Sequence, residues 1–205
     1  MIRAGVRRAP PGYRLQAVSA EVVVSTSDYA LRRATLADVA VLDVLIDHSV
    51  RGLGPGHYTP SEIEAGLRHV FGVDTQLVTD GTYYLIEHHD AAVACGGWSG
   101  RRTLFGGDQH KSGADDRLDP SIAPARIRAF FVHPEHARRG LGRRLYEVCA
   151  DAARAAGFHT LELMATLPGV PLYTALGFEP HERVAVPTPS GPLPCIRMTR
   201  SIDGV

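Results

Sequence analysis

A strand, a turn and a helix in close succession between residues 127 and 157 constrain this chain most. The β-branched and aromatic residues of 127–132 favour a strand, and Pro134, which lacks a backbone N–H, ends it. After Gly140 the apolar residues recur at helical spacing, and Gly157 stands where a left-handed C-terminal cap is expected. The sequence therefore predicts a strand that leads through a short turn into an amphipathic helix.

The start of the predicted helix has no side-chain cap. Ser, Thr, Asp or Asn usually caps a helix, but residues 139–143 read Arg-Gly-Leu-Gly-Arg. The first N–H groups are then free, the glycines let a ligand approach the backbone, and the helix dipole and the arginines favour an anion. The segment indicates a phosphate-binding turn, although taken alone it fits an ordinary glycine turn with solvated arginines equally well.

Spacing excludes two widespread phosphate-binding motifs. A Walker loop has Gly directly before Lys-Ser, but His110 precedes Lys111 here. A dinucleotide-binding fingerprint has a third glycine three residues after Gly142, and that position is Leu145. If the turn binds phosphate, it therefore belongs to a different type of phosphate site.

The segment resembles the core motif of the GNAT superfamily, the acyl-CoA-dependent N-acyltransferases. That motif reads roughly Val-x-Pro, then Arg/Gln-x-x-Gly-x-Gly/Ala at the start of a helix. The matching positions are Val132, Pro134, Gly140 and Gly142. A second family segment follows in order, because a strand at 160–165 precedes a short helix with the Tyr-x-x-x-Gly-Phe pattern at 173–178.

Two positions depart from the family pattern. Ala137 stands where the family has Arg or Gln, so one phosphate contact is missing and Arg138 or Arg139 would replace it. Pro168 stands where an Asn is common after the second strand, which removes the contact made there.

The resemblance implies an α/β (α+β) fold. We expect a single GNAT-like domain over residues 28–205, with a mixed, mostly antiparallel sheet of about six to seven strands and helices on both faces. Its splayed central strands would form the acyl-CoA site. Residues 1–27, with their scattered arginines and prolines, are expected to be a poorly ordered N-terminal extension.

Local patterns predict the remaining elements. Thr35 with Asp38 begins a first helix, and Thr59 or Ser61 begins a second, so two helices bracket a loop that resembles the substrate-facing lid of the family. A long polar excursion is expected at 105–124. The predicted strands outside the motif are 29–33, a hairpin at 82–88 and 91–99, and a final hairpin at 182–186 and 195–201.

The resemblance also implies a reaction. An acyl group, with acetyl favoured, would pass from acetyl-CoA or another acyl-CoA to a primary amine by direct attack in a ternary complex. Tyr173 is expected to be the general acid for the CoA thiolate, with a buried core tyrosine as the other interpretation. The expected acyl-CoA-binding residues are Phe131, Val132, Arg138, Arg139, Gly140, Leu141, Gly142 and Arg143.

Several parts of the function stay open from the residues. The general base is one of Glu62, Glu64, Asp108, His110 and His133, or water. The acceptor is a small-molecule or peptide amine, and neither its identity nor the acyl chain length follows from the sequence. A non-catalytic acyl-CoA-binding or sensing module is the alternative function, and a scaffold protein with a vestigial groove is a third.

Composition argues against other classes of protein. Lys plus Arg equals Asp plus Glu at 22 each, which disfavours nucleic acid or an anionic membrane as a partner. The three cysteines form no CxxC pair, and no apolar run reaches the roughly 18 residues of a membrane span. We expect a soluble, cytoplasmic protein whose cysteines are buried hydrophobes, and a homodimer is left open.

The ten histidines do not predict a metal site. His88 and His89 are expected on opposite faces of a strand, and His133 and His136 flank Glu135 without a metal-binding spacing. Strand alternation also sends one of the two aromatic residues at 130–131 to the face where an acceptor would lie.

Overall fold

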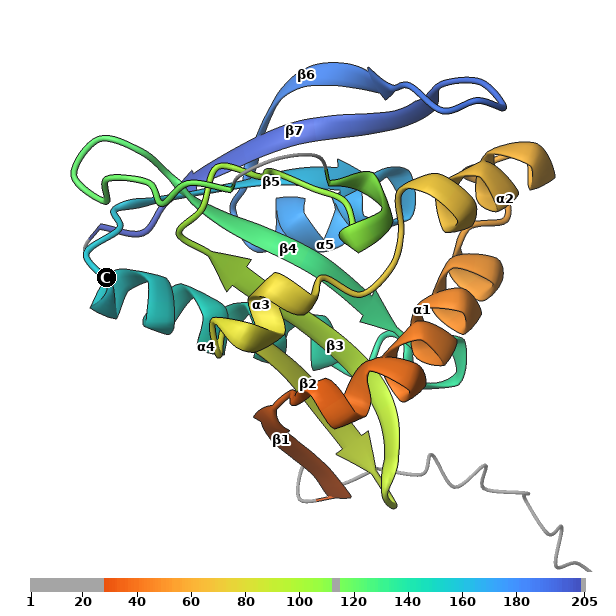
Figure 1. Cartoon of the computed structure of the whole chain (residues 1–205), viewed down its shortest axis with the longest axis horizontal. Coiled ribbons are helices and arrows are strands. Elements are labelled where there is room, and N and C mark those ends of the chain that lie inside the picture. The colour runs from red at the N-terminus through yellow and green to blue at the C-terminus, as the bar shows by residue number, and fades with distance from the viewer. Residues whose placement is uncertain (1–27, 112–114, 204–205) are drawn as a thin grey trace, which may run out of the picture.

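The structure is a computed structural model that describes residues 28–111 and 115–203, so the predicted extension at 1–27 lies outside it. Its described strands form one sheet in the order β1-β2-β3-β4-β5-β7-β6 (Figure 1), and every neighbouring pair is antiparallel except β4 with β5. The predicted mixed, mostly antiparallel sheet is confirmed. The strands are β1 (Tyr29–Arg33), β2 (Tyr83–His88), β3 (Ala91–Ser99), β4 (Ala125–Val132), β5 (Thr160–Thr166), β6 (Glu179–Val186) and β7 (Leu193–Ser201).

Helices cover both faces of the sheet, as predicted (Figure 1). On one face lie α1 (Val39–Leu53), α2 (Pro60–His69) and α3 (Thr75–Thr79), and on the other lie α4 (Leu141–Ala155) and α5 (Val170–Ala175). Each face has its own hydrophobic core, centred on Leu42 and Leu85 on the first and on Leu145 and Leu161 on the second. Short 3₁₀ turns occupy Leu36–Asp38, Asp108–His110, Pro134–His136 and Leu167–Gly169.

The central strands β4 and β5 part soon after they meet. Along their described length they pair only at Ala125 with Leu161 and at Arg126 with Glu162. Beyond that point β4 stays paired with β3 and β5 stays paired with β7, so a gap opens between them. The splayed central strands expected from the sequence are therefore present.

A β-bulge in β4 decides which side chains face which core. Gly96 of β3 opposes two residues of β4, Ala129 and Phe130, and Ala129 adopts a φ of 52°. A Cβ on Gly96 would lie 2.3 Å from the Phe130 ring, so only glycine fits there. Phe130 then packs on the α4 side and Phe131 on the α1 side, which agrees with the expectation that the two rings face opposite ways.

Some local expectations were wrong. Helix α3 was not predicted, because its five residues are too few to show a helical period. Strand β7 begins at Leu193 and includes Pro194, which the proline-rich connection was expected to contain. Pro194 is tolerated because the ladder of β7 with β5 starts only at Cys195. His89 has a φ of 49° in the β2–β3 turn, so its ring lies 4.1 Å from that of His88 and not on the opposite face.

A buried ion-pair network ties two loops to β4. The Asp74 carboxylate is fully buried, caps α3 through the N–H of Gln76 at 3.1 Å, and pairs with Arg128 at 2.7 Å and with Lys111. Arg128 also donates to the carbonyls of Thr103 at 2.9 Å and Gly106 at 2.6 Å. The loops at 70–75 and 103–111 are therefore held against the same strand.

Replacing Asp74 with alanine should destabilise the fold severely. The change removes a helix cap and leaves the buried Arg128 guanidinium without its counter-charge, which typically costs about 3–5 kcal/mol. Urea unfolding of Asp74→Ala checks this result. Asp47→Ala is the control, because it removes an exposed carboxylate that pairs with Arg51 on the surface, and it should change the unfolding midpoint little. Equal losses in the two variants would contradict the importance of the buried network.

Candidate functional site

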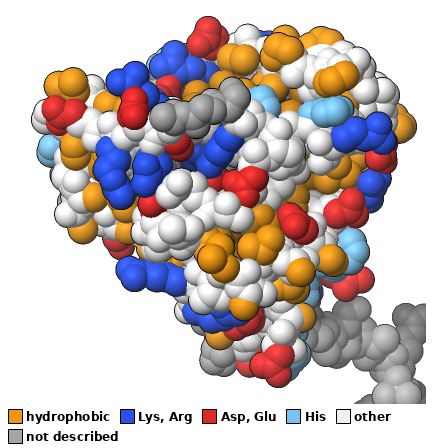
Figure 2. Space-filling view, in the orientation of Figure 1, with side chains coloured by type: hydrophobic (Ala, Val, Ile, Leu, Met, Phe, Trp, Pro, Cys, Tyr) orange, Lys and Arg blue, Asp and Glu red, His pale blue; other side chains and the backbone are white. Residues whose placement is uncertain are grey.

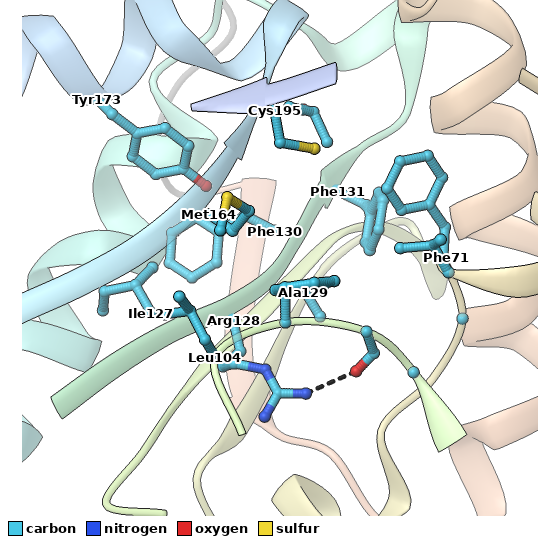
Figure 3. A pocket seen from close by; sticks show the side chains of 16 residues that line it. Phe71, Leu104, Ile127, Arg128, Ala129, Phe130, Phe131, Met164, Tyr173 and Cys195 are labelled. Atoms are coloured by element: carbon cyan, nitrogen blue, oxygen red, sulfur yellow. Dashed lines mark hydrogen bonds between the residues drawn. The ribbon is translucent and has the colours of Figure 1, made fainter. Parts of the chain in front are cut away.

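A pocket occupies the gap between β4 and β5 (Figure 3). Strand β4 contributes residues 127–131, β5 contributes Met164 and Thr166, and β7 contributes Cys195. Helix α5 contributes Tyr173, and the loops at 70–72 and 104–107 close the opposite side. Six separate parts of the chain thus meet at the place where the sheet opens.

Tyr173 lies partly in the core and partly in this pocket. Its ring packs against Phe130 and Phe178, with centroids 6.3 and 5.7 Å away, and only 8% of the residue is exposed. Its hydroxyl points toward Met164 and the pocket in Figure 3 and makes no hydrogen bond to another described residue. Burial raises the pKa of Tyr173 above its ordinary value, so the phenol is neutral near pH 7 and can donate a proton.

The turn before α4 has the geometry of an anion-binding site. Arg138 has a φ of 63° and Gly140 a φ of 81°, and no side chain caps the helix. The first backbone hydrogen bond of α4 runs from the Arg144 N–H to the Gly140 carbonyl at 3.0 Å. The preceding N–H groups, at Leu141, Gly142 and Arg143, therefore have no acceptor among the described residues.

Three arginines surround this turn. The side chains of Arg138, Arg139 and Arg143 are exposed, and only that of Arg139 has a described polar partner, the Tyr29 hydroxyl at 3.3 Å. The free N–H groups, the helix N-terminus and the positive charge of the exposed arginines together favour an anion at this position.

Helices α4 and α5 join the turn to the pocket. Gly142, in the first turn of α4, lies so close to α5 that a Cβ there would approach Leu172 Cδ2 to 2.8 Å. Leu172 directly precedes Tyr173, so a shift of the turn is transmitted to the residue that lines the pocket. The absence of a side chain at Gly142 thus sets the distance between the two parts of the site.

Phe131 and Val132, both expected to bind acyl-CoA, lie differently at the end of β4. Phe131 lines the pocket, whereas Val132 does not. The Val132 N–H donates to Ser49 Oγ of α1 at 3.1 Å, while the next N–H, of His133, donates to Val93 of β3 at 2.8 Å. Ser49 is thus a polar neighbour of the strand end that sequence reasoning missed, because its helix is far away in the chain.

The five candidate bases all lie outside the pocket lining. Glu62 accepts the Thr59 N–H at 2.7 Å and so caps its own helix, while Glu64 pairs with Arg51 on the surface. Asp108 accepts the N–H of Thr75 at 3.1 Å. Each of these three carboxylates therefore makes a hydrogen bond or an ion pair within the protein.

The two histidine candidates pack against neighbouring aromatic rings. His110 packs on Phe105 with centroids 4.9 Å apart. His133 lies 5.5 Å from His48 and 5.8 Å from His136, in a group of rings beside β1. Among the described residues that line the pocket there is no carboxylate and no imidazole.

Two further findings concern metals and membranes. Within the described ranges, no three His, Cys, Asp or Glu side chains are grouped so that they could hold a metal ion. No helix in the described part of the chain combines the length and apolar character needed to cross a bilayer.

A comparison of the sequence with models of protein families identifies the family of this chain. The model of the acetyltransferase (GNAT) family matches residues 57–178, which is more than half of the chain. The chain belongs to the GNAT family. This match contains both the β4–α4 turn and Tyr173. A search of curated proteins by sequence found no match.

Solved GNAT structures share the fold at low identity. A GCN5-related N-acetyltransferase from Rhodopseudomonas palustris superposes with a TM-score of 0.64 at 18% identity, over 87% of this chain and 99% of that one. YncA of Salmonella typhimurium, solved with acetyl-CoA, gives 0.57 at 18% identity over 87% and 96%. PaiA N-acetyltransferase of Thermoplasma acidophilum, solved with coenzyme A, gives 0.57 at 12% identity over 84% and 98%. At these identities the likeness establishes the fold.

Proposed function

We propose that this GNAT protein transfers an acyl group, with acetyl favoured, from acyl-CoA to a primary amine by direct attack in a ternary complex. The observation that carries the proposal is the pocket between β4 and β5, which Tyr173 of α5 lines, together with the uncapped start of α4 that packs closely on Leu172 of the same helix α5. Two related structures that hold acetyl-CoA or CoA give independent support.

The turn at 138–143 would hold the CoA pyrophosphate. The free N–H groups of Leu141, Gly142 and Arg143 point along the helix axis toward the anion, and the exposed arginines add charge. Ala137 has no donor on its side chain, so Arg138 or Arg139 would supply the contact that other family members make there. The unpaired edge of β4 beyond Arg126 offers backbone groups to the amides of the pantetheine arm.

The reacting groups would meet in the pocket. The amine nitrogen attacks the thioester carbonyl, the C–N bond forms, and the C–S bond then breaks to release CoA thiolate. The Val132 N–H lies beyond the bulge and outside the pocket lining, and it would be the donor for the oxyanion only after the Ser49 hydroxyl turns away from it. Tyr173 gives its proton to the thiolate and regains one from solvent.

The amine must lose a proton before it attacks. An alkyl ammonium has a pKa of about 10.4, so near pH 7 almost all of it is protonated. Because no carboxylate or imidazole is found among the described residues of the pocket lining, we assign this proton to water.

Replacing Gly140 with valine should weaken CoA binding. A β-branched residue is strained at a φ of 81°, so the turn would rebuild and its N–H groups would turn away from the pyrophosphate. We expect a loss of affinity of about tenfold or more, measured by calorimetry. Gly81→Val is the control, because Gly81 has a φ of 70° and the same open surroundings far from the turn. Unchanged CoA affinity in a folded Gly140→Val protein would exclude the proposed phosphate site.

Replacing Tyr173 with phenylalanine should separate catalysis from folding. The ring and its packing stay while the hydroxyl is lost, so turnover should fall by about a hundred- to ten-thousandfold if departure of the thiolate limits the rate. CoA affinity and thermal stability should barely change. Tyr84→Phe removes a hydroxyl from a buried tyrosine outside the pocket lining and should retain activity. Full activity in Tyr173→Phe would refute its role as the acid.

The pH profile should rise without a descending limb in the neutral and mildly alkaline range. As pH rises toward the pKa of the acceptor, the neutral amine and kcat/KM should increase about tenfold per pH unit. Tyr173 remains a proton donor throughout, because its pKa is raised by burial and its proton is lost only above its ordinary value of about 10. Rates of thiol release between pH 6 and 9 test this. A fall in rate within that range would point to a different acid.

The alternative, a module that binds or senses acyl-CoA without turnover, has two observations in its favour. Ala137 and Pro168 depart from the family pattern, and the Val132 N–H is already bonded to Ser49. Such a module would bind CoA but release no thiol with any amine, so calorimetry and a thiol assay on the same preparation distinguish the two functions.

A further inference from the structure

The pocket wall on the side of α1 and α2 is apolar. Phe71 and Phe131 meet edge to face with centroids 6.1 Å apart, and they lie on the far side of the pocket from Tyr173 (Figure 3). Leu104 and Phe105 of the long loop extend the same wall. An acceptor that enters beside Phe131 would therefore contact mainly hydrocarbon.

The wall also offers no free charge to an acceptor. Arg128 is the one permanently charged side chain among the described residues that line the pocket, and it is 2% exposed. It pairs with Asp74 at 2.7 Å and donates from its two terminal nitrogens to the carbonyls of Thr103 and Gly106, while its buried Nε has no described hydrogen-bond partner. Burial raises the pKa of the Cys195 thiol to about 11, so this lining residue is neutral as well.

Hydrogen bonds between the two loops fix the wall in place. The Gly107 N–H donates to the Val70 carbonyl at 2.9 Å, and the Asp108 N–H donates to the Val73 carbonyl at 3.0 Å. The Gln109 side chain donates to the Phe71 carbonyl at 2.6 Å. The apolar lining is thus preorganised, which limits rearrangement toward a polar ligand.

The charge pattern of the outer surface is different. On the face shown in Figure 2, basic and acidic side chains lie interspersed, so this face does not select a charged ligand by a field of one sign. On this face, the pocket itself is the part that can distinguish one amine from another.

We propose, on the basis of the acyltransferase function above, that the acceptor is a primary amine carried on an uncharged apolar group. A polyamine or an aminoglycoside would bring a second ammonium group into this wall. That charge would be desolvated without a free carboxylate to pair with it, which is unfavourable. An aromatic or aliphatic tail instead gains from burial against Phe71, Leu104 and Phe131.

A matched pair of amines isolates the effect of charge. Hexylamine and cadaverine have the same number of heavy atoms, and they differ in a terminal methyl against a terminal ammonium. With saturating acetyl-CoA, the kcat/KM of thiol release should favour hexylamine by about tenfold or more, which corresponds to at least 1.4 kcal/mol. Equal rates or a preference for cadaverine would overturn the proposal.

Substitution of Leu104 tests the wall directly. Leu104→Asp places a carboxylate on the half-buried loop and should shift the preference toward cadaverine by about tenfold or more, through charge pairing. Leu104→Asn is the matched control, since it has the same shape without the charge and should weaken hexylamine without improving cadaverine. A switch in both variants, or in neither, would exclude a wall that selects by charge.

Binding separates this proposal from the proposed function. If no amine releases thiol, the acyltransferase function fails, and calorimetry of the protein–CoA complex with the same two amines still tests the acceptor class. Tighter binding of hexylamine would support the apolar pocket. Equal binding, or binding of neither amine, would overturn it.

Discussion

The short pairing between β4 and β5 is the constraint on which the site depends. Two residue pairs hold these parallel strands together at one end, and the buried Glu162, which pairs with Arg126 and Arg197, lies at that closed end. Each strand keeps its other neighbour, so the sheet opens without losing its ladders elsewhere. The opening supplies both an unpaired strand edge and a pocket within an otherwise continuous sheet.

Beside this opening, the buried charge of Arg128 is already paired. Arg128 would be costly in a strand between two hydrophobic cores, and the Asp74 carboxylate and two loop carbonyls compensate its charge. Because the same contacts dock the loops at 70–75 and 103–111, one ion-pair network both stabilises the wall and pairs the Arg128 charge within it. Under the proposed function, the stability of the wall and the choice of acceptor are therefore coupled.

Much of the fold could be predicted from local sequence. Helical and strand periods, the Thr35–Asp38 and Thr59–Glu62 caps and the turn at Gly157 depend on residues within a few positions of one another. The uncapped glycine turn before α4 was visible for the same reason. The motif around it, together with the Tyr-x-x-x-Gly-Phe segment, led to the correct family although similar solved structures share less than a fifth of their residues with this chain.

What the sequence by itself determined is thus the order of elements, the family and the turn at the start of α4. Only the tertiary structure decided what lines the pocket, since Phe71, Leu104, Phe131, Met164 and Tyr173 come from separate elements that meet where two strands diverge. It also decided that Glu62 and Glu64 cap or pair on the surface, and that Ser49 reaches the Val132 N–H. Such contacts depend on packing between distant segments, which no local period encodes.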